Sequence, residues 1–459
     1  MDAFVIQGGK RLRGRVRVHG SKNASLPLLA AALLTDDPVT LRDVPDLSDI
    51  ANMGKLLGAL GCTSERCLER GRSVTRLRVT DAGPVEAHYD IVRTMRASVC
   101  VLGPLLAQRG RARVSMPGGC NIGDRPVDLH IRGLRALGAN ITLDAGYIVA
   151  ERPGGGRGRL HGARVFLGGP FGSTVLGTDN VMCAAALAEG TTLIESAACE
   201  PEVADLADML NKMGAKIHGA GTPRITIEGV SRLHGIDHTV IPDRIEAGTY
   251  LMAAAITNGD VVLENCPTDA LTALLDRLEQ VGVEIENLKP AKPHAAGKGR
   301  RRAPATDDSG ADDGMRQPVR VASRRRLNPV QVVTQPHPGF PTDLQAQIMA
   351  LLCLADGNSI ITEKIFPDRF LHVAELLRMG ASCIRNGPSV MVSGVRRLIG
   401  APVMASDLRA SAGLVLAGLA ATGTTTINRV YHLDRGYERM ELTLQDLGAD
   451  IQRVSVPGV

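Results

Sequence analysis

The spacing of hydrophobic and polar positions along this chain switches between that of a helix and that of a strand. The same order of predicted helices and strands occurs six times. In one such passage, "TDNVMCAAALAEG" at 178–190 consists mainly of small and apolar residues and predicts a buried helix that Gly190 ends. "TTLIES" then alternates as a strand, and "PEVADLADMLNKMG" has the spacing of an amphipathic helix with Gly214 at its C-terminal cap. "AKIHGAGTPRITIEGV" supplies two strands around a glycine-rich turn. The pattern predicts a βαβαββ unit.

Each passage ends its second helix with an apolar residue followed by glycine. These glycines are Gly61, Gly138, Gly214, Gly282, Gly380 and Gly448. One such unit cannot bury its own helices, so neighbouring units should share a core, with the Ala-rich helix of each unit inside it. The sequence therefore predicts an α/β (α+β) fold of six units, in which only the fourth interval between glycines is long.

The composition explains the long interval. Residues 288–327 are rich in Pro, Gly, Ala and charge, in a basic, an acidic and a second basic block. Such a segment buries too little apolar surface to fold alone, so we expect a polar, mobile insertion on the surface. An arm that binds nucleic acid or a protein partner is the alternative.

Composition also narrows the class of protein. A chain of 459 residues is long enough for two large domains, and its nine cysteines follow no disulfide framework, which favours reduced cytosolic thiols. The N-terminus lacks an apolar signal core and no apolar run approaches about 20 residues, so we expect a soluble, cytoplasmic protein without a membrane span. A net charge of +5 and 2% aromatic residues argue against a surface for stacking nucleic-acid bases. Small anions remain suitable ligands, because Arg and Lys can gather in a cleft.

Two stretches carry candidate chemistry. "SMPGGCNIGDRPVDLH" at 115–130 places Cys120 in a run of Pro and Gly, with Arg125 nearby and no second cysteine for a metal or redox motif. A thiol on a flexible loop near cations can donate a proton or act as a nucleophile; the alternative is an incidental loop cysteine. Lys22 and Asn23 stand just before an apolar helical run, where a helix N-terminus favours an anion.

Six long motifs are spread over the chain. They are "GSKNASLPLLAAALL" at 20–34, "RTMRAS" at 93–98, "PGGCNIGDRPVDLH" at 117–130, "PTDLQAQ" at 341–347, "DLRASAGLVLAG" at 407–418 and "HLDRGYER" at 432–439. Together they closely resemble the UDP-N-acetylglucosamine enolpyruvyl transferases, nearly from end to end. The resemblance implies transfer of the enolpyruvyl group of phosphoenolpyruvate to the 3-hydroxyl of the sugar, with release of phosphate, as the first committed step of peptidoglycan synthesis. It implies no metal or organic cofactor.

The same resemblance implies a two-domain inside-out α/β barrel with three units in each domain. We expect residues 22–240 to form the first domain, with the Cys120 loop, and residues 1–21 plus 241–459 to form the second. In the family the domains close on the sugar nucleotide, which excludes water from the reacting centre. We further expect a monomer that binds these two substrates, no nucleic acid, and sensitivity to the epoxide fosfomycin, which alkylates the thiol.

Five residues match catalytic positions of the family. Cys120 matches the loop cysteine that protonates the methylene carbon and can form a covalent adduct. Lys22 matches the residue that holds the phosphate and carboxylate of phosphoenolpyruvate, and Asn23 the one that steadies the tetrahedral intermediate. Asp343 matches the leading candidate for the general base, and Asp407 a residue that assists proton transfer or positions the intermediate. For Asn23 and Asp343 the alternative is a simple helix N-cap.

Arginines of the motifs are implied as ligands of the anionic groups. Arg125 and Arg435 would surround phosphoenolpyruvate, because a guanidinium binds carboxylate or phosphate with two parallel hydrogen bonds. Arg409 matches a further residue near phosphoenolpyruvate, and Arg96 one near the nucleotide or the closing interface. An isolated Arg is more often a solvated surface charge, so these assignments depend on the motifs.

Contacts with the sugar nucleotide are implied for a further set of residues. These are Arg125, Pro126, Val127, Asp128, Leu129, Thr174, Val175, Ile365 and Arg369. The chain departs from the family where a lysine and a small "SVGAT" loop grip the diphosphate. It reads "GPFGSTVLGTDN", which leaves Gly172 and Leu176 where Lys and Gly are expected. Either another arginine compensates, or the nucleotide is held differently.

Three other functions stay open. The sister enzyme that transfers the same group to shikimate 3-phosphate shares the architecture, but the "PGGC" loop and "RPVDLH" are not expected in it. A non-catalytic paralogue that binds the sugar nucleotide would be expected to lose Cys120, Lys22 or Asp343, and all three are present. A nucleic-acid-binding protein is disfavoured because the basic residues of the insertion are interleaved with aspartates and no aromatic residue lies among them.

Overall fold

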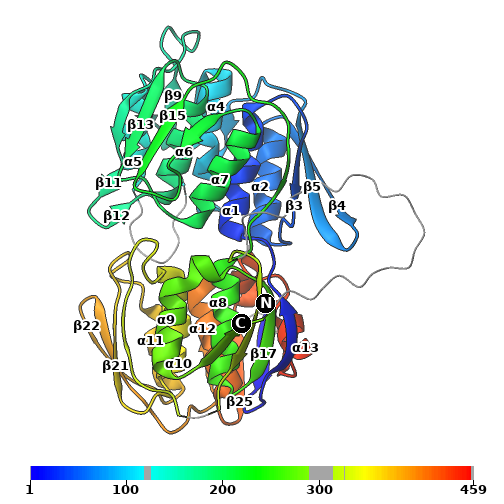
Figure 1. The fold of residues 1–459 in the computed structure, drawn as a ribbon, viewed down its shortest axis with the longest axis vertical. Helices are drawn as coiled ribbons and strands as arrows, with labels where there is room; N and C mark the ends of the chain where they lie inside the picture. The colour runs from blue at the N-terminus through cyan, green and yellow to red at the C-terminus, as the bar shows by residue number, and fades with distance from the viewer. Residues whose placement is uncertain (1, 118–125, 289–313, 325, 456–459) are drawn as a thin grey trace.

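Two hydrophobic cores divide the molecule. The computed structural model describes residues 2–117, 126–288, 314–324 and 326–455. One core gathers buried residues between Ala24 and Val240, and the other gathers those of 4–18 and 245–451. We call the parts around them the first lobe and the second lobe. Figure 1 shows the lobes stacked along the long axis, the first above the second, with both chain ends in the second.

The six four-stranded sheets of the described residues share one strand pattern, in which an outer strand runs parallel to its neighbour and the other two pairings are antiparallel. In the first lobe the sheets are β16 (Asp237–Thr239), β3 (Val39–Arg42), β5 (Arg72–Val79) and β4 (Cys62–Glu69); β6 (Glu86–Ala87), β7 (Arg111–Ser115), β9 (Tyr147–Glu151) and β8 (Asn140–Asp144); and β10 (Arg164–Phe166), β13 (Thr191–Glu195), β15 (Arg224–Glu228) and β14 (Lys216–His218).

The second lobe repeats this order with the help of the N-terminus. Its sheets are β2 (Arg13–Arg17), β17 (Asp260–Cys266), β19 (Gln317–Ala322) and β18 (Glu284–Asn287); β20 (Gln331–Val333), β21 (Asn358–Thr362), β23 (Ser389–Ser393) and β22 (Ser382–Asn386); and β24 (Pro402–Met404), β25 (Thr424–Asn428), β1 (Asp2–Gln7) and β26 (Asp450–Ser455). Because β1 and β2 belong to two of these sheets, the first residues of the chain complete the second lobe.

Six helices lie inside the lobes. They are α1 (Lys22–Ala31), α4 (Leu102–Arg109), α6 (Val175–Ala186), α8 (Arg244–Ile256), α10 (Gln345–Leu352) and α12 (Leu408–Ala420). Their small side chains allow close contact: a Cβ on Gly103 of α4 would lie 2.3 Å from the carbonyl oxygen of Asn180 in α6. All residues of α8 are buried, as are those of α6 from Gly177 to its end. The predicted burial of the Ala-rich helices is confirmed.

The outer helices end where the sequence predicted. They are α2 (Ser48–Ala59), α5 (Asp128–Ala136), α7 (Pro201–Lys212), α9 (Thr272–Val281), α11 (Leu371–Arg378) and α13 (Met440–Asp446). Each is followed by one of the six predicted glycines, whose φ angles lie between 74° and 105°, in the left-handed region that favours glycine. The helix end predicted at Gly190 is wrong: α6 ends at Ala186, and Gly190 lies in the turn before β13.

The insertion predicted over 288–327 is partly wrong as well. Residues 289–313 lie outside the described part, but β19 at Gln317–Ala322 is an inner strand of its sheet, paired with β17 and β18. Val319 and Val321 are fully buried. The alternation of "QPVRVA" is that of a strand with one buried face, and the charged blocks around it concealed this signal.

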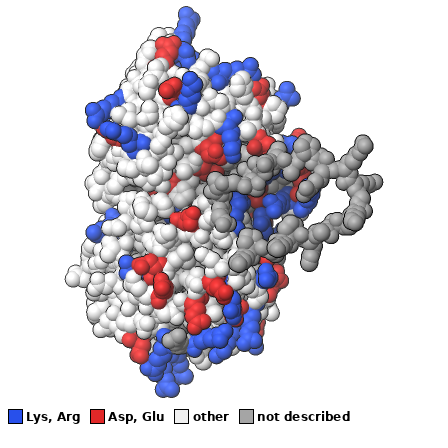
Figure 2. All heavy atoms as spheres, in the orientation of Figure 1, with Lys and Arg blue, Asp and Glu red and all other residues white. Residues whose placement is uncertain are grey.

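Short elements complete the chain: α3 (Tyr89–Val92), the two-stranded pair β11 (Gly168–Gly169) and β12 (Gly172–Ser173), and 3₁₀ turns at Ala32–Leu34, Arg96–Val101, Thr268–Leu271, Thr342–Leu344 and Val430–Arg435. The cysteines of the described residues are free thiols. In the same part of the chain, no helix combines the length and apolar character that crossing a membrane requires. Figure 2 shows Lys and Arg interspersed with Asp and Glu over one face.

Candidate active site between the lobes

The chain crosses between the lobes in two adjacent segments, which are joined by backbone hydrogen bonds. Ser21 N–H donates to the Ile241 carbonyl at 2.7 Å, and Asp243 N–H donates to the His19 carbonyl at 2.8 Å. The Asp243 carboxylate then accepts hydrogen bonds from Lys22 N–H at the start of α1 and from the first N–H groups of α8. One buried aspartate thus ties together a helix N-terminus from each lobe, which fixes the position of Lys22.

Lys22 and Arg435 meet at Asp49, a buried carboxylate of α2. The Lys22 Nζ lies 3.2 Å from Asp49 Oδ2, and the Arg435 Nε lies 3.0 Å from Oδ1. Burial alone raises the pKa of Asp49, but the two cations outweigh burial and hold the pKa below its ordinary value. Two residues predicted to bind phosphoenolpyruvate, one from each lobe, are therefore brought to the same point.

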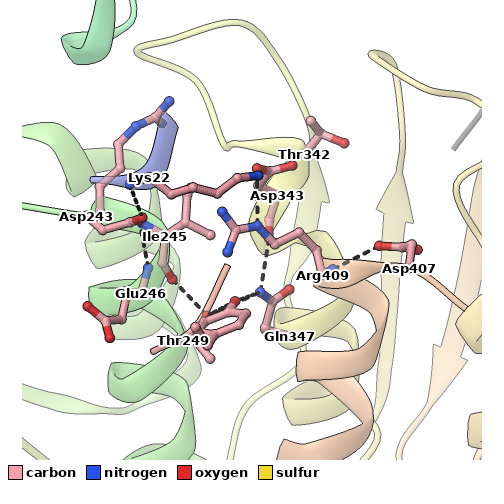
Figure 3. A network of polar contacts seen from close by, with 12 residues as sticks. Lys22, Asp243, Ile245, Glu246, Thr249, Thr342, Asp343, Gln347, Asp407 and Arg409 are labelled. Carbon is pink, nitrogen blue, oxygen red and sulfur yellow. Dashed lines mark hydrogen bonds and ion pairs between the residues drawn. The ribbon is translucent and has the colours of Figure 1, made fainter. Parts of the chain in front are cut away.

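Asp343 lies in the second lobe, in the 3₁₀ turn that directly precedes α10. Its Oδ1 is 2.8 Å from Arg369 Nη1 and its Oδ2 is 3.3 Å from Arg409 Nε. Burial would raise the pKa of Asp343, yet Arg369 and Arg409, with Lys22 behind them, lower it far below its ordinary value. Figure 3 shows Lys22, Asp343 and Arg409 converging from three different elements. The site therefore holds an ionised carboxylate beside a group of cations.

Arg409 is fully buried and only partly paired. Its two terminal nitrogens have no hydrogen-bond partner among the described residues, although the guanidinium lies over the Tyr437 ring with 5.2 Å between centres. Tyr437 is held by Thr249 at 2.9 Å and by Gln347 at 3.2 Å. A buried cation with unused donors is suited to bind an anion that enters the site.

Asp407 has a clear structural position. Its Oδ1 accepts from the N–H groups of Arg409 and Ala410, so it caps α12, and Arg369 Nη2 lies 3.9 Å from the same oxygen. The alternative role as a helix N-cap is wrong for both Asn23 and Asp343. Ser21 caps α1, with Asn23 inside the helix, and the Asp343 carboxylate binds arginines instead of backbone N–H groups.

Most residues implied for the sugar nucleotide lie at the starts of first-lobe helices. Thr174 caps α6 and is followed by Val175, while Pro126 and Val127 lead into α5, whose first two residues are Asp128 and Leu129. Leu129 lies against Gly169 of β11, since a Cβ there would be 3.2 Å from its side chain. Arg96 begins the 3₁₀ turn after α3. Cys120 and Arg125 lie outside the described residues.

A cavity of about 490 Å³ opens between the turn joining β11 to β12 and loops of the second lobe. Its lining comprises Pro170, Phe171, Gly172, Thr334, Gln335, Pro336, Glu363, Lys364, Ile365, Pro367 and Pro388. It brings Ile365, an implied sugar-nucleotide contact, to the loop in which the sequence departs from the family. The structure thus places Ile365 beside the loop that has Gly172 where the family motif has lysine.

Several residues of this site escaped sequence reasoning. Asp49 and Asp243 lie outside the matched functional positions, and Gln347 and Tyr437 lie inside motifs without an assigned role. Asp243 stands directly before an Ala-rich helical run and could have been found as an N-cap. Asp49 carries no such signal, because its function comes from pairing with Arg435, which is 386 positions away.

Sequence comparisons agree with this geometry. The profile of the family described as "EPSP synthase (3-phosphoshikimate 1-carboxyvinyltransferase)" matches residues 6–444. The UDP-N-acetylglucosamine 1-carboxyvinyltransferase of Anaeromyxobacter dehalogenans strain 2CP-C is 54% identical over 455 residues, which cover 99% of this chain and 100% of the relative. The protein of the same name from Myxococcus xanthus strain DK1622 is 50% identical over 456 residues, or 99% of both chains.

Solved structures show the same fold. The enolpyruvyl transferase NikO from Streptomyces tendae matches with a TM-score of 0.82 and 25% identity, over 99% of both chains. An EPSP synthase from Acinetobacter baumannii matches with a TM-score of 0.72 and 19% identity, over 99% of this chain and 100% of that one. At this identity the second match concerns the fold alone. The mixed helix and strand architecture is that of enolpyruvyl transferases.

Proposed function

The chain belongs to the UDP-N-acetylglucosamine 1-carboxyvinyltransferases within the EPSP synthase family, and from this premise we propose the reaction that its site performs. The protein transfers the enolpyruvyl group of phosphoenolpyruvate to the 3-hydroxyl of UDP-N-acetylglucosamine and releases phosphate. This reaction belongs to peptidoglycan synthesis. The observation that carries the proposal is the ionised Asp343, held by Arg369 and Arg409 beside Lys22 where the lobes meet.

The cations form the site for phosphoenolpyruvate. Lys22 and Arg435 share Asp49 as counter-ion, and Arg409 keeps donors that no described residue binds. A phosphate or carboxylate group can take hydrogen bonds from all three because each is already fixed by a packed element. Arg125 is proposed as a further cation from the family motif.

The proposed acid and the proposed base are different residues. In the proposed sequence Cys120 gives a proton to the methylene carbon while the 3-hydroxyl oxygen bonds to the adjacent carbon and loses its proton toward Asp343. Asn23 steadies the resulting tetrahedral intermediate. Elimination then removes a proton from the new methyl group and breaks the carbon–oxygen bond to phosphate, so that the double bond returns, phosphate leaves and the enolpyruvyl ether is formed. Asp407 positions Arg409 and the intermediate through the N-terminus of α12.

The proposal extends to the architecture. The six sheets with one strand pattern and the six glycines after outer helices support six βαβαββ units in an inside-out barrel. The separate cores support a first domain over 22–240 and a second over 1–21 plus 241–459. Closure of these domains on the sugar nucleotide would keep water from the intermediate. We place the enzyme in the cytoplasm as a monomer that serves cell-wall growth, cell shape and division.

The rival acceptor is shikimate 3-phosphate. Relatives with at least half of their positions identical carry the sugar-nucleotide name, whereas the matched EPSP synthase structure shares 19% identity. The presence of Lys22 and Asp343, and the Arg409 donors that no described residue binds, also argue against a non-catalytic paralogue. These observations favour the sugar nucleotide over both alternatives.

The deciding experiment measures phosphate release from phosphoenolpyruvate with UDP-N-acetylglucosamine in one reaction and shikimate 3-phosphate in another. Release is expected only with the sugar nucleotide, and it should be abolished by fosfomycin or by Cys120→Ala. A parallel Cys199→Ala variant, at a half-buried thiol of the first lobe, serves as control and should stay active. Release only with the shikimate ester, or in neither reaction, would contradict the proposal.

A further inference from the structure

The cavity between the β11–β12 turn and the second lobe is lined mainly by apolar residues and by few charged ones. Proline, phenylalanine and isoleucine supply most of its walls, and the two charged residues among its lining are Glu363 and Lys364. Figure 1 shows β11 and β12 at the edge of the first lobe that faces the second. A ligand that spans the lobes here would meet apolar surface and one cation.

Both carboxylate oxygens of Glu363 accept hydrogen bonds from within the protein. It is completely buried, and its Oε1 accepts hydrogen bonds from the Thr334 hydroxyl at 2.7 Å and from the N–H groups of Ile365 and Phe366 at 2.8 and 3.0 Å. Its Oε2 accepts from the Thr342 hydroxyl at 2.9 Å. These bonds fix the loop and spread the negative charge over four donors.

The side chain of Lys364, unlike that of Glu363, is exposed. The backbone N–H of Lys364 donates to the Thr334 hydroxyl at 2.9 Å, so its Cα is fixed. Among the described residues its ammonium takes part in no ion pair. The loop therefore presents, from a rigid backbone, a cation without an ion-pair partner among the described residues, and the fixed backbone reduces the conformational entropy lost when it binds an anion.

The facing loop offers no cation at Gly172, where the family motif has lysine. The φ of Gly172 is +110°, and a Cβ there would lie 2.8 Å from Cγ of Pro336 across the cavity. Any side chain would be strained in this backbone and would collide with the second lobe. The position therefore remains glycine as long as the lobes approach in this way, and the charge must come from elsewhere.

We propose that Lys364 binds the diphosphate of the sugar nucleotide from the second lobe, in place of the lysine missing at position 172. The inference rests on the proposed function. α6 starts three positions beyond Gly172, so its N-terminal dipole and Lys364 would meet the diphosphate from opposite lobes. The diphosphate then links the lobes, and Lys364 determines how tightly the nucleotide is held.

The test compares Lys364→Met with Lys10→Met, which removes the same charge from another exposed lysine of the second lobe. Binding of UDP alone is titrated by calorimetry, and KM is measured for each substrate. Lys364→Met should weaken UDP binding and raise KM for the sugar nucleotide about tenfold, the loss expected for one charge-assisted hydrogen bond. KM for phosphoenolpyruvate should change less than about twofold, and Lys364→Arg should restore most of the affinity.

The results separate this inference from the proposed function. Unchanged UDP affinity in Lys364→Met, or equal losses in Lys364→Met and Lys10→Met, would overturn the role of Lys364. An equal rise of KM for both substrates would also overturn it, because it would indicate a general disturbance of the site. If the wild-type protein releases no phosphate with the sugar nucleotide, the proposed function fails, and the UDP titration still decides whether Lys364 binds a diphosphate.

Discussion

Asp49 is where two cations of the site converge. Its carboxylate is almost completely buried and touches Lys22 of the first lobe and Arg435 of the second. Phosphoenolpyruvate must attract these same cations. Asp49 therefore serves as an internal anion that keeps them close and oriented before the substrate arrives.

Asp49→Asn should destabilise the free protein by roughly 1–3 kcal/mol at neutral pH, because two cations lose their counter-charge. The pKa of Asp49 is lowered in the folded state, so its contribution is present above its ordinary pKa of 3.8 and lost in acid. Inorganic phosphate should raise the melting temperature of the variant more than that of the wild type. Thermal unfolding with and without phosphate measures both effects.

Asp46→Asn is the matched control, since Asp46 pairs with Arg66 on the surface. That variant should lose less than about 1 kcal/mol and should respond to phosphate like the wild type. If phosphate stabilises Asp49→Asn and the wild type equally, Asp49 does not act as the internal anion of the site.

Sequence reasoning reached the residues of this site unequally. Lys22, Asp343 and Arg409 lie in motifs that a resemblance can match position by position. Asp49 and Asp243 do not, because their importance comes from contacts between distant parts of the chain. A sequence shows which side chains are available, whereas pairing across two lobes depends on how the lobes are placed.

At the scale of elements, α12 shows how a helix end presents a cation. Asp407 caps its first turn, and the same turn carries Arg409, which is buried against Tyr437. The cap fixes the backbone from which the Arg409 side chain reaches Asp343. Asp407 therefore combines a structural role, as the cap of α12, with a proposed role in the reaction. Two variants of Asp407 can separate these roles.

Asp407→Ala should lower the free energy of unfolding by about 1 kcal/mol, since alanine cannot accept from the helix N–H groups. Asp407→Asn should stay within about 0.5 kcal/mol of the wild type, because asparagine caps as well as aspartate. If the charge of Asp407 takes part in the reaction, both variants lose kcat to a similar extent. Urea unfolding and steady-state kinetics decide, and an Asn variant of full activity would limit Asp407 to capping.

Regular elements were easier to predict than interrupted ones. The six glycines after outer helices all adopt the left-handed conformation that their spacing required. β19 was missed because charged residues surround a strand of six residues, and composition over 288–327 outweighed the local alternation. A period-two pattern in so short a strand is weak unless its partners β17 and β18 are known.

At the scale of the whole molecule, the two crossing segments hold the lobes at a defined distance. His19 lies in one of them, and its Nδ1 is 2.9 Å from Oε1 of Glu246 in α8, while its backbone N–H donates to the other carboxylate oxygen. Arg244 in the second crossing pairs with Glu202 of α7 at 2.9 Å, in a buried contact. Charged contacts therefore brace the hinge through which any lobe closure must act.

The His19–Glu246 contact makes this brace depend on pH. Glu246 raises the pKa of His19 from 6.5 to about 9, against the opposing effect of burial. A group whose pKa is higher in the folded state stabilises that state fully below its unfolded pKa and loses this contribution as pH rises through the folded pKa. The stabilisation should therefore be complete near pH 6 and fade between about 6.5 and 9.

His19→Gln tests this, because glutamine keeps a hydrogen-bond donor without the charge. The difference in free energy of unfolding between wild type and variant should be largest near pH 6 and should approach zero above pH 9, where His19 is neutral. Urea unfolding across this range measures the difference, and NMR titration of the His19 ring measures the pKa directly. A pH-independent difference, or a ring that titrates near 6.5, would mean that Glu246 does not hold the charge of His19.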